Sequence, residues 1–248
     1  MTVPTSTPPR RHSRWPHLHQ GTNEKPTLGT ARTTGMLYLA LALTGVLGFL
    51  LVRPQLLTDE PTVTLTTLTD QESLARLGIA LELGVVLTQA LTAVWFYRLF
   101  RHVDSVAAAT LAAFGVVNAT VILGSAASLA TAVDLALDPV GDAAGQVRLL
   151  IGLSANLWGV GALFFGLWLV PMGLLALRAG MPRPLGWLLF TGGVGYLLSA
   201  FVAYLAPGAQ PVANVLIIPA TIGEFWMIGY LLHGGVFRKP GTATAASS

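Results

Sequence analysis

Residues 33–52 read TTGMLYLALALTGVLGFLLV, twenty residues without a charged side chain. A helix needs about 20 apolar residues to cross the hydrocarbon core of a bilayer, because each residue adds ~1.5 Å along the axis. This stretch has that length and follows a polar N-terminal region. We therefore interpret it as the first membrane-spanning helix of the chain.

Five further stretches meet the same criterion. They are residues 76–97, 105–133, 147–177, 185–205 and 212–233. In the whole chain 53% of the residues are hydrophobic and 10% are charged, whereas a soluble domain has about 25% charged residues. So few charges do not cover a water-facing surface. The sequence predicts an all-α, polytopic membrane bundle of six transmembrane helices within residues 31–237, with the lipid bilayer as its main partner.

The regions that flank the spans are polar. Residues 1–30 are rich in Pro, Thr, His and Arg and are predicted to be a disordered basic tail, and residues 238–248 form a second short tail. Eleven of the fourteen Lys and Arg residues fall in the tails and loops on one side: Arg10, Arg11, Arg14, Lys25, Arg32, Arg98, Arg101, Arg178, Arg183, Arg238 and Lys239. Cytoplasmic loops carry such an excess, so both termini are expected in the cytoplasm.

The longest loop, residues 53–75, is predicted on the outer side and includes Arg53. Within it, residues 62–69 alternate polar and apolar side chains, which is compatible with a short strand. We favour a solvated loop that leads into the second span, with Asp70 as the residue that caps the helix N-terminus.

Two spans each contain one interior acidic residue, Glu82 and Glu224. An ionised carboxylate in the hydrocarbon region costs at least ~2.5 kcal/mol on insertion scales, so such residues mark cavities or polar partners. Arg76 and Arg148 fall at the outer ends of their spans, and no Lys or Arg lies in the interior of a predicted span, so we expect both side chains to be protonated. They are candidates for binding a small molecule or a proton. The alternative is that each one only hydrogen-bonds between helices.

Three amide side chains also fall inside predicted spans. Gln89 lies seven residues after Glu82, while Asn118 and Asn156 belong to the third and fourth spans. Taken singly, each amide is adequately explained by an interhelical hydrogen bond. Because four spans supply polar groups, we predict one shared interior cluster of Glu82, Gln89, Asn118, Asn156 and Glu224.

A short internal similarity links the first and fifth spans. Residues 35–39 and 193–197 both read Gly-x-x-Tyr-Leu, and the span after each carries its glutamate. The two helical hairpins are therefore either parallel pseudo-repeats, which some transporters use, or similar by coincidence.

Several kinds of chemistry find no support in the sequence. Cysteine is absent, which excludes disulfides, thiolate nucleophiles and Cys-bound metals. No zinc-protease, phosphate-binding or nucleophile-elbow motif occurs. No histidines face each other within spans as haem ligands. We therefore predict no catalytic residue, no metal site, no cofactor and no nucleic-acid partner, and an enzyme is the least favoured interpretation.

One long stretch resembles a known family. Residues 164–186, FFGLWLVPMGLLALRAGMPRPLG, with the fifth-span motif and residues 223–232, GEFWMIGYLL, resemble the bacterial DUF4386 family of six-span membrane proteins. The resemblance implies the fold and a bacterial inner (plasma) membrane location, and it implies no activity. The function therefore stays open between a protein that binds or moves a small molecule or proton and a non-catalytic interaction or accessory protein whose glutamates are structural.

Overall fold

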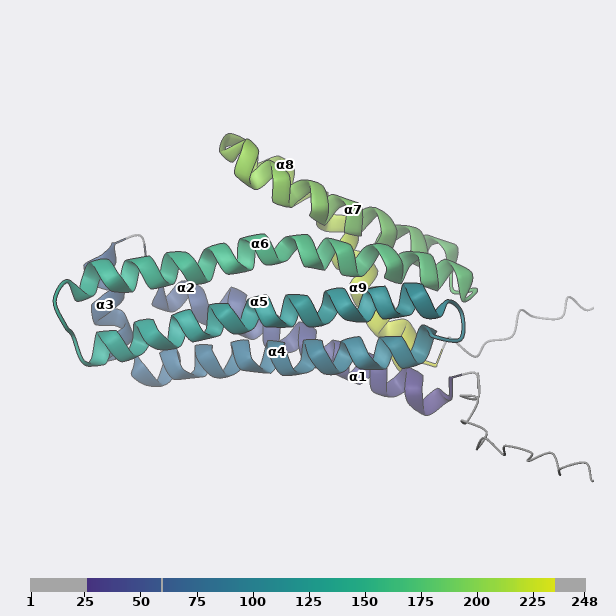
Figure 1. The fold of residues 1–248 in the computed structure, drawn as a ribbon, viewed down its shortest axis with the longest axis horizontal. Coiled ribbons are helices and arrows are strands. Elements are labelled where there is room, and N and C mark those ends of the chain that lie inside the picture. The colour runs from purple at the N-terminus through teal and green to yellow at the C-terminus, as the bar shows by residue number, and fades with distance from the viewer. Residues whose placement is uncertain (1–25, 59, 235–248) are drawn as a thin grey trace, which may run out of the picture.

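The computed structural model describes residues 26–58 and 60–234, which are nearly all helical (Figure 1). Six helical segments among them are long and apolar enough to cross a membrane. They are Leu28–Leu56, Glu72–Phe100 (α4), Ser105–Leu137 (α5), Ala143–Arg178 (α6), Arg183–Leu205 (α7) and Gln210–Leu232. The predicted all-α bundle with six membrane-spanning helices is confirmed. Most of the N-terminal tail and all of the C-terminal tail lie outside the described residues.

The first span is longer than predicted and has three parts. α1 (Leu28–Gly45) continues through a π-helical stretch, η1 (Val46–Val52), into α2 (Arg53–Leu56). In the wider π turn the backbone N–H of Arg53 donates to the carbonyl of Gly48, five residues earlier. The predicted position of Arg53 in an outer loop is therefore wrong: the residue extends the first helix.

The segment predicted as a solvated loop or strand is a helix, α3 (Pro61–Asp70). Pro61 occupies its first turn, where a missing N–H costs nothing. Leu68 is fully buried, and the Thr69 hydroxyl donates to the carbonyl of Ala136 at 3.1 Å, so α3 is fastened to the end of α5. Asp70 ends α3 and does not cap α4, whose preceding residue is Gln71.

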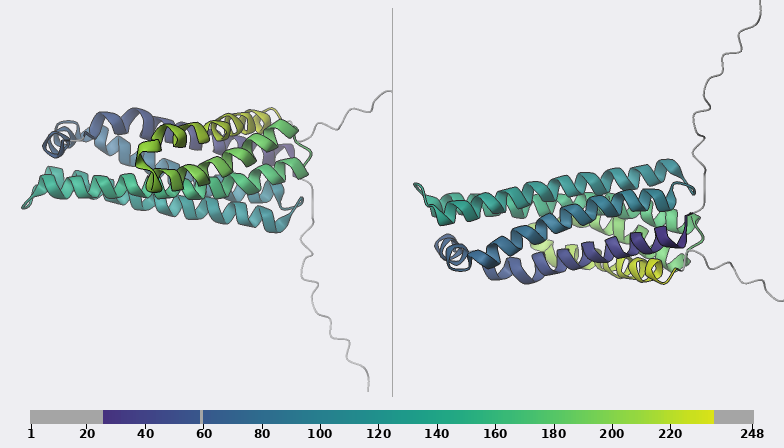
Figure 2. Two further views of the ribbon diagram at one scale, coloured as in Figure 1. Left: turned by 90° about the horizontal axis from the view of Figure 1, so that it is seen from above. Right: turned by 90° about the horizontal axis from the view of Figure 1, so that it is seen from below.

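The six spans form a closed ring. α1 packs on α4, α4 on α5, α5 on α6, α6 on α7, α7 on α9 (Ile218–Leu232), and α9 on α1. Both views in Figure 2 place α1 and α9 side by side, on the side of the bundle away from α5. Three aromatic rings pack together in the core. The ring centroid of Phe96 lies 5.3 Å from that of Tyr38 and 5.6 Å from that of Trp168.

The last span is broken into two helices, α8 (Gln210–Leu216) and α9, after a short 3₁₀ turn η2 (Pro207–Ala209). Pro219 lies in the first turn of α9 and has no N–H to continue the ladder. At the break, a Cβ on Gly195 of α7 would lie 2.0 Å from the Leu216 carbonyl oxygen, so only glycine fits there.

The turns at the end of the bundle opposite α3 are tied together. Asp104 caps α5 by accepting a hydrogen bond from the backbone N–H of Ala107 at 3.0 Å, and its other oxygen accepts from Arg178 at the end of α6. The Ala107 hydrogen bond lowers the pKa of Asp104, and the Arg178 charge lowers it further. Gly180 follows α6 with φ +76°, a left-handed conformation that suits glycine.

Candidate functional site

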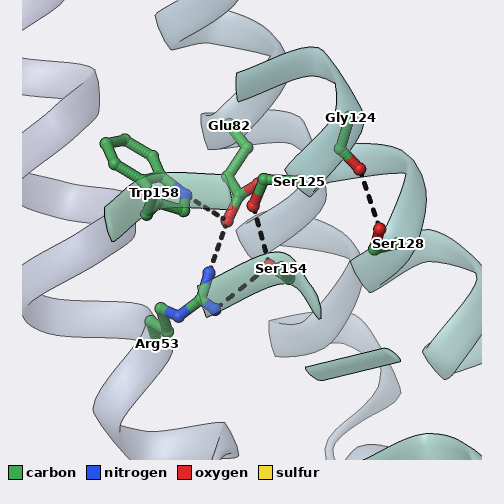
Figure 3. Close-up of polar contacts among 7 residues, drawn as sticks. All are labelled: Arg53, Glu82, Gly124, Ser125, Ser128, Ser154 and Trp158. Carbon is green, nitrogen blue, oxygen red and sulfur yellow. Dashed lines mark hydrogen bonds and ion pairs between the residues drawn. The ribbon is translucent and has the colours of Figure 1, made fainter. Parts of the chain in front are cut away.

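Glu82 sits in a closed polar cluster inside the bundle (Figure 3). Its Oε1 accepts from Arg53 Nη1 at 2.9 Å and from the Trp158 indole N–H at 3.3 Å, and its Oε2 accepts from the Ser125 hydroxyl at 3.0 Å. Glu82 is 5% exposed. Both carboxylate oxygens are satisfied by protein groups, as a buried ion pair requires.

The same cluster joins four spans. Ser154 accepts a hydrogen bond from Arg53 Nη2 at 3.0 Å, and its hydroxyl lies 2.7 Å from that of Ser125. Residues from α2, α4, α5 and α6 thus meet at one level. The expectation that Glu82 lacks a counter-ion is wrong, because the first helix continues beyond the predicted span to Leu56 and so includes Arg53.

Glu224 has different surroundings. Its Oε1 accepts from the Tyr38 hydroxyl at 2.5 Å, which links α9 to α1 across 186 residues of sequence. Among the described residues no hydrogen-bond partner exists for its Oε2. The two carboxyl oxygens of Glu224 therefore differ in their surroundings.

A cavity of about 200 Å³ opens beside Glu224. We call it the α1–α9 cavity, and its lining residues come from α1, η1, α4, α6 and α9: Tyr38, Leu41, Ala42, Gly45, Val46, Val85, Trp158, Phe165, Thr221, Glu224, Phe225 and Ile228. No Lys, Arg or His is among them, so Glu224 is the only ionisable group of the lining apart from a tyrosine. The cavity is an apolar, aromatic space with one acidic group.

The structure does not bring the predicted site residues into one cluster. Glu82 lies outside the lining of the α1–α9 cavity and borders a separate void of about 10 Å³. Trp158 joins the two regions, because it lines the cavity while its N–H bonds to Glu82. The two glutamates therefore occupy neighbouring but different sites.

The amides are divided as well. Gln89 and Asn118 are 1% and 0% exposed, and none of their side-chain N and O atoms has a hydrogen-bond partner. Gln89 follows Glu82 by seven residues on α4, and Asn118 precedes Ser125 by seven residues on α5. Because these two helices are antiparallel, both amides lie about 10 Å from the Glu82 cluster in the same direction along the bundle. Asn156, expected inside, is exposed and donates only to the carbonyl of Gly152, one turn earlier on its own helix.

Sequence reasoning did not assign several polar residues of these sites, among them Arg53, Tyr38, Ser125 and Ser154. Arg53 stood at the end of an apolar run, and a helix a few residues longer would have placed it near Glu82. Tyr38 was noted only as part of the Gly-x-x-Tyr-Leu similarity, and no sequence pattern pointed to Ser154. Over the described residues no group of three His, Asp or Glu side chains gathers as a metal site.

The comparisons with known proteins bear on the family alone. Residues 33–235 match the family described as "Domain of unknown function (DUF4386)". No curated protein and no solved structure matches the chain. The match covers both glutamate sites and all of the candidate spans except residues 28–32 of the first. The chain therefore belongs to the DUF4386 family.

Proposed function

We propose that this membrane protein binds a small, largely apolar molecule in the α1–α9 cavity. The observation that carries the proposal is Glu224, which lines the cavity from within a membrane span and whose Oε2 has no hydrogen-bond partner among the described residues. A polar group at this depth is costly unless something satisfies it. A bound molecule would interact with the Glu224 carboxyl oxygen for which the described residues provide no partner.

The lipid phase is the proposed source of that molecule. Several lining residues are also on the outer surface of the bundle: Val46 is 39% exposed and Phe225 is 55% exposed. Both lie on spans, so their exposed surface faces lipid rather than water. The cavity thus has a lateral mouth between α1 and α9, through which a membrane-dissolved molecule enters.

The alternative is that both glutamates only hold helices together. Glu82 fits this alternative, because every oxygen of its carboxylate has a partner within the protein. Glu224 does not fit it fully, because the Tyr38 hydrogen bond uses one oxygen, the other has no partner among the described residues, and the residue lines the cavity. We assign the structural role to Glu82 and the binding role to Glu224.

The proposed location is the inner membrane of a bacterium, with both termini in the cytoplasm. The excess of Lys and Arg on the side of the termini supports this orientation. In that orientation α3 lies at the outer face, and the Asp104–Arg178 pair lies at the inner face.

Binding is tested with two probes of nearly equal shape, phenyltrimethylammonium and its neutral analogue tert-butylbenzene. Each is equilibrated with the purified protein in lipid nanodiscs, and partition into empty nanodiscs is subtracted. We expect saturable binding of at least one probe. Gly45→Leu should abolish it, because a side chain at Gly45 meets no atom within 4 Å and extends into the space that the residue lines.

The matched control is Gly152→Leu. Gly152 also has open space around it, but it lies on α6 outside the cavity lining. Binding should therefore survive this change. Absence of saturable binding for both probes, or equal binding by wild type and Gly45→Leu, overturns the proposal.

A further inference from the structure

We infer that the ligand of the α1–α9 cavity is a small organic cation, an ammonium ion with apolar substituents, and that Glu224 is its counter-ion. This inference rests on the proposed function and specifies its ligand class. It follows from the charges, the aromatic lining and the size of the cavity.

The protein places no basic side chain beside Glu224 in the cavity lining. The guanidinium of Arg53 is linked to the cavity wall only through Glu82 and Trp158, and it is committed to Glu82 and Ser154. A cationic ligand is the partner that a carboxylate in a low-dielectric site lacks.

The polar atoms of the aromatic residues in the lining already donate hydrogen bonds to glutamates of the protein. The indole N–H of Trp158 points to Glu82, and the hydroxyl of Tyr38 points to Glu224. Phe165 and Phe225 have no polar side-chain atom. What these four residues offer to a ligand is ring carbon, and ring faces attract ammonium groups with apolar substituents.

The neutral polar groups of the lining do not suit other ligand classes. An anion would meet the Glu224 carboxyl and find no basic partner. A sugar-like molecule needs many donors and acceptors. Besides Glu224, Tyr38 and the Trp158 indole N–H that is bonded to Glu82, the lining has only the Thr221 hydroxyl. The volume of about 200 Å³ is below the ~300–1,000 Å³ of drug-sized pockets, so the cation is small.

The decisive experiment compares the two probes, which differ in charge and hardly in shape. For the wild-type protein in nanodiscs we expect phenyltrimethylammonium to bind about tenfold or more tightly than tert-butylbenzene. Glu224→Gln should remove that preference by weakening the cation alone. Glu72→Gln is the matched control. It makes the same chemical change in a glutamate that forms an exposed ion pair with Arg76 and lies outside the cavity lining.

A second variant keeps the test informative if Glu224→Gln does not fold. Phe225→Leu retains the carboxyl and removes an exposed ring at the cavity mouth. It should weaken the cation about twofold to thirtyfold, the range of one cation–π contact, and leave the neutral probe unchanged.

The outcomes separate the two claims. Equal binding of both probes, blocked by Gly45→Leu and unaffected by Glu224→Gln and Phe225→Leu, overturns the cation inference and leaves the binding function standing. Binding of neither probe overturns the proposed function itself. A cation preference lost in Glu224→Gln and retained in Glu72→Gln supports both.

Discussion

At the scale of single residues, Glu82 and Glu224 show how strongly surroundings decide the role of a side chain. The Glu82 carboxylate has three donors from Arg53, Ser125 and Trp158. The Glu224 carboxyl has one donor and a cavity. The donors around Glu82 hold neighbouring helices together. At Glu224 one carboxyl oxygen has no partner among the described residues, and we propose that an external molecule binds there.

The Arg53–Glu82 pair gives a stability prediction. Arg53→Met removes the counter-ion of a buried carboxylate, and such a break costs about 3–5 kcal/mol. The matched control is Arg76→Met, which breaks the exposed pair with Glu72 and should cost at most about 1 kcal/mol. The free energy of unfolding is measured by SDS titration of the protein in mixed micelles. Equal losses in the two variants would show that the Glu82 cluster is not the buried ion pair described here.

Asp104 gives a prediction on pH dependence. Its pKa is lowered in the folded protein, first by the Ala107 N–H and then by Arg178. The stabilisation is thus present above the unfolded pKa of about 3.9 and is lost as the pH falls through the lower folded pKa. Asp104→Asn keeps a capping side chain and removes the charge. Its melting temperature should be below that of wild type at neutral pH.

The Asp104 difference should shrink as the pH falls below about 4 towards the lowered folded pKa, because protonation of Asp104 progressively removes its charge. Melting temperatures of wild type and Asp104→Asn, measured in detergent from neutral pH to about pH 3, check this. A difference that stays constant down to the lowest pH would mean that the charge of Asp104 contributes nothing.

Residue patterns predicted part of these sites. A glutamate inside an apolar run is visible without a structure, and both glutamates were selected for that reason. Their partners are not visible, because Arg53 looked like the first residue of a loop. Asn156 was placed inside by its position in an apolar run, yet the run does not show which face of α6 points to lipid.

At the scale of elements, the break between α8 and α9 positions the cavity. α8 packs on α7, whereas α9 contacts both α7 and α1. The break allows the last span to change direction between these neighbours, and α9 then presents Thr221, Glu224 and Phe225 to the cavity. A straight helix through residues 210–232 would not have this freedom.

Gly195 provides the test of that element. Gly195→Ala would place a methyl group 2.0 Å from the Leu216 carbonyl oxygen, so α7 and the break must move apart. Overpacking of this kind costs about 1–3 kcal/mol. Gly152→Ala, with no atom within 4 Å of the added carbon, should be neutral or stabilising by up to about 1 kcal/mol. Unfolding free energies compare the two, and an equal response would contradict the tight contact.

Two elements escaped prediction for identifiable reasons. The threonines of α3 alternate with apolar residues, which mimics a strand, but Pro61 starts a helix and Leu68 finds a buried site between neighbouring helices. Side chains of the π-helical η1 contact other helices, such as Phe49 on Trp158 at 5.0 Å between ring centroids. No local pattern specifies such contacts.

At the scale of the whole molecule, the number of spans was predictable because the bilayer imposes a length and a composition on each one. Closure of the ring was not, since α1 and α9 are joined by residues such as Tyr38 and Glu224, which are 186 positions apart. Hydropathy describes each helix against lipid and says nothing about which helices are neighbours.

The proposed orientation is tested on the intact protein. The chain has no cysteine, so single cysteines report unambiguously. Val140→Cys, at the turn between α5 and α6, should react with a membrane-impermeant maleimide added outside cells. Thr242→Cys, near the C-terminus, should react only after the membrane is permeabilised. The reverse labelling pattern would invert the topology.

The shared position of Trp158 has a consequence for how the molecule responds to occupancy. One side of this indole borders the cavity, and its N–H is held by Glu82. A ligand that displaces the Trp158 ring must lengthen its hydrogen bond to Glu82. Because such coupling acts in both directions, a change that weakens the Arg53–Glu82 ion pair also changes the affinity for the ligand. Trp158 thereby connects binding at the lipid-facing mouth to a polar junction of four helices, and the infrared carboxylate band of Glu82 becomes a remote reporter of whether the cavity is filled.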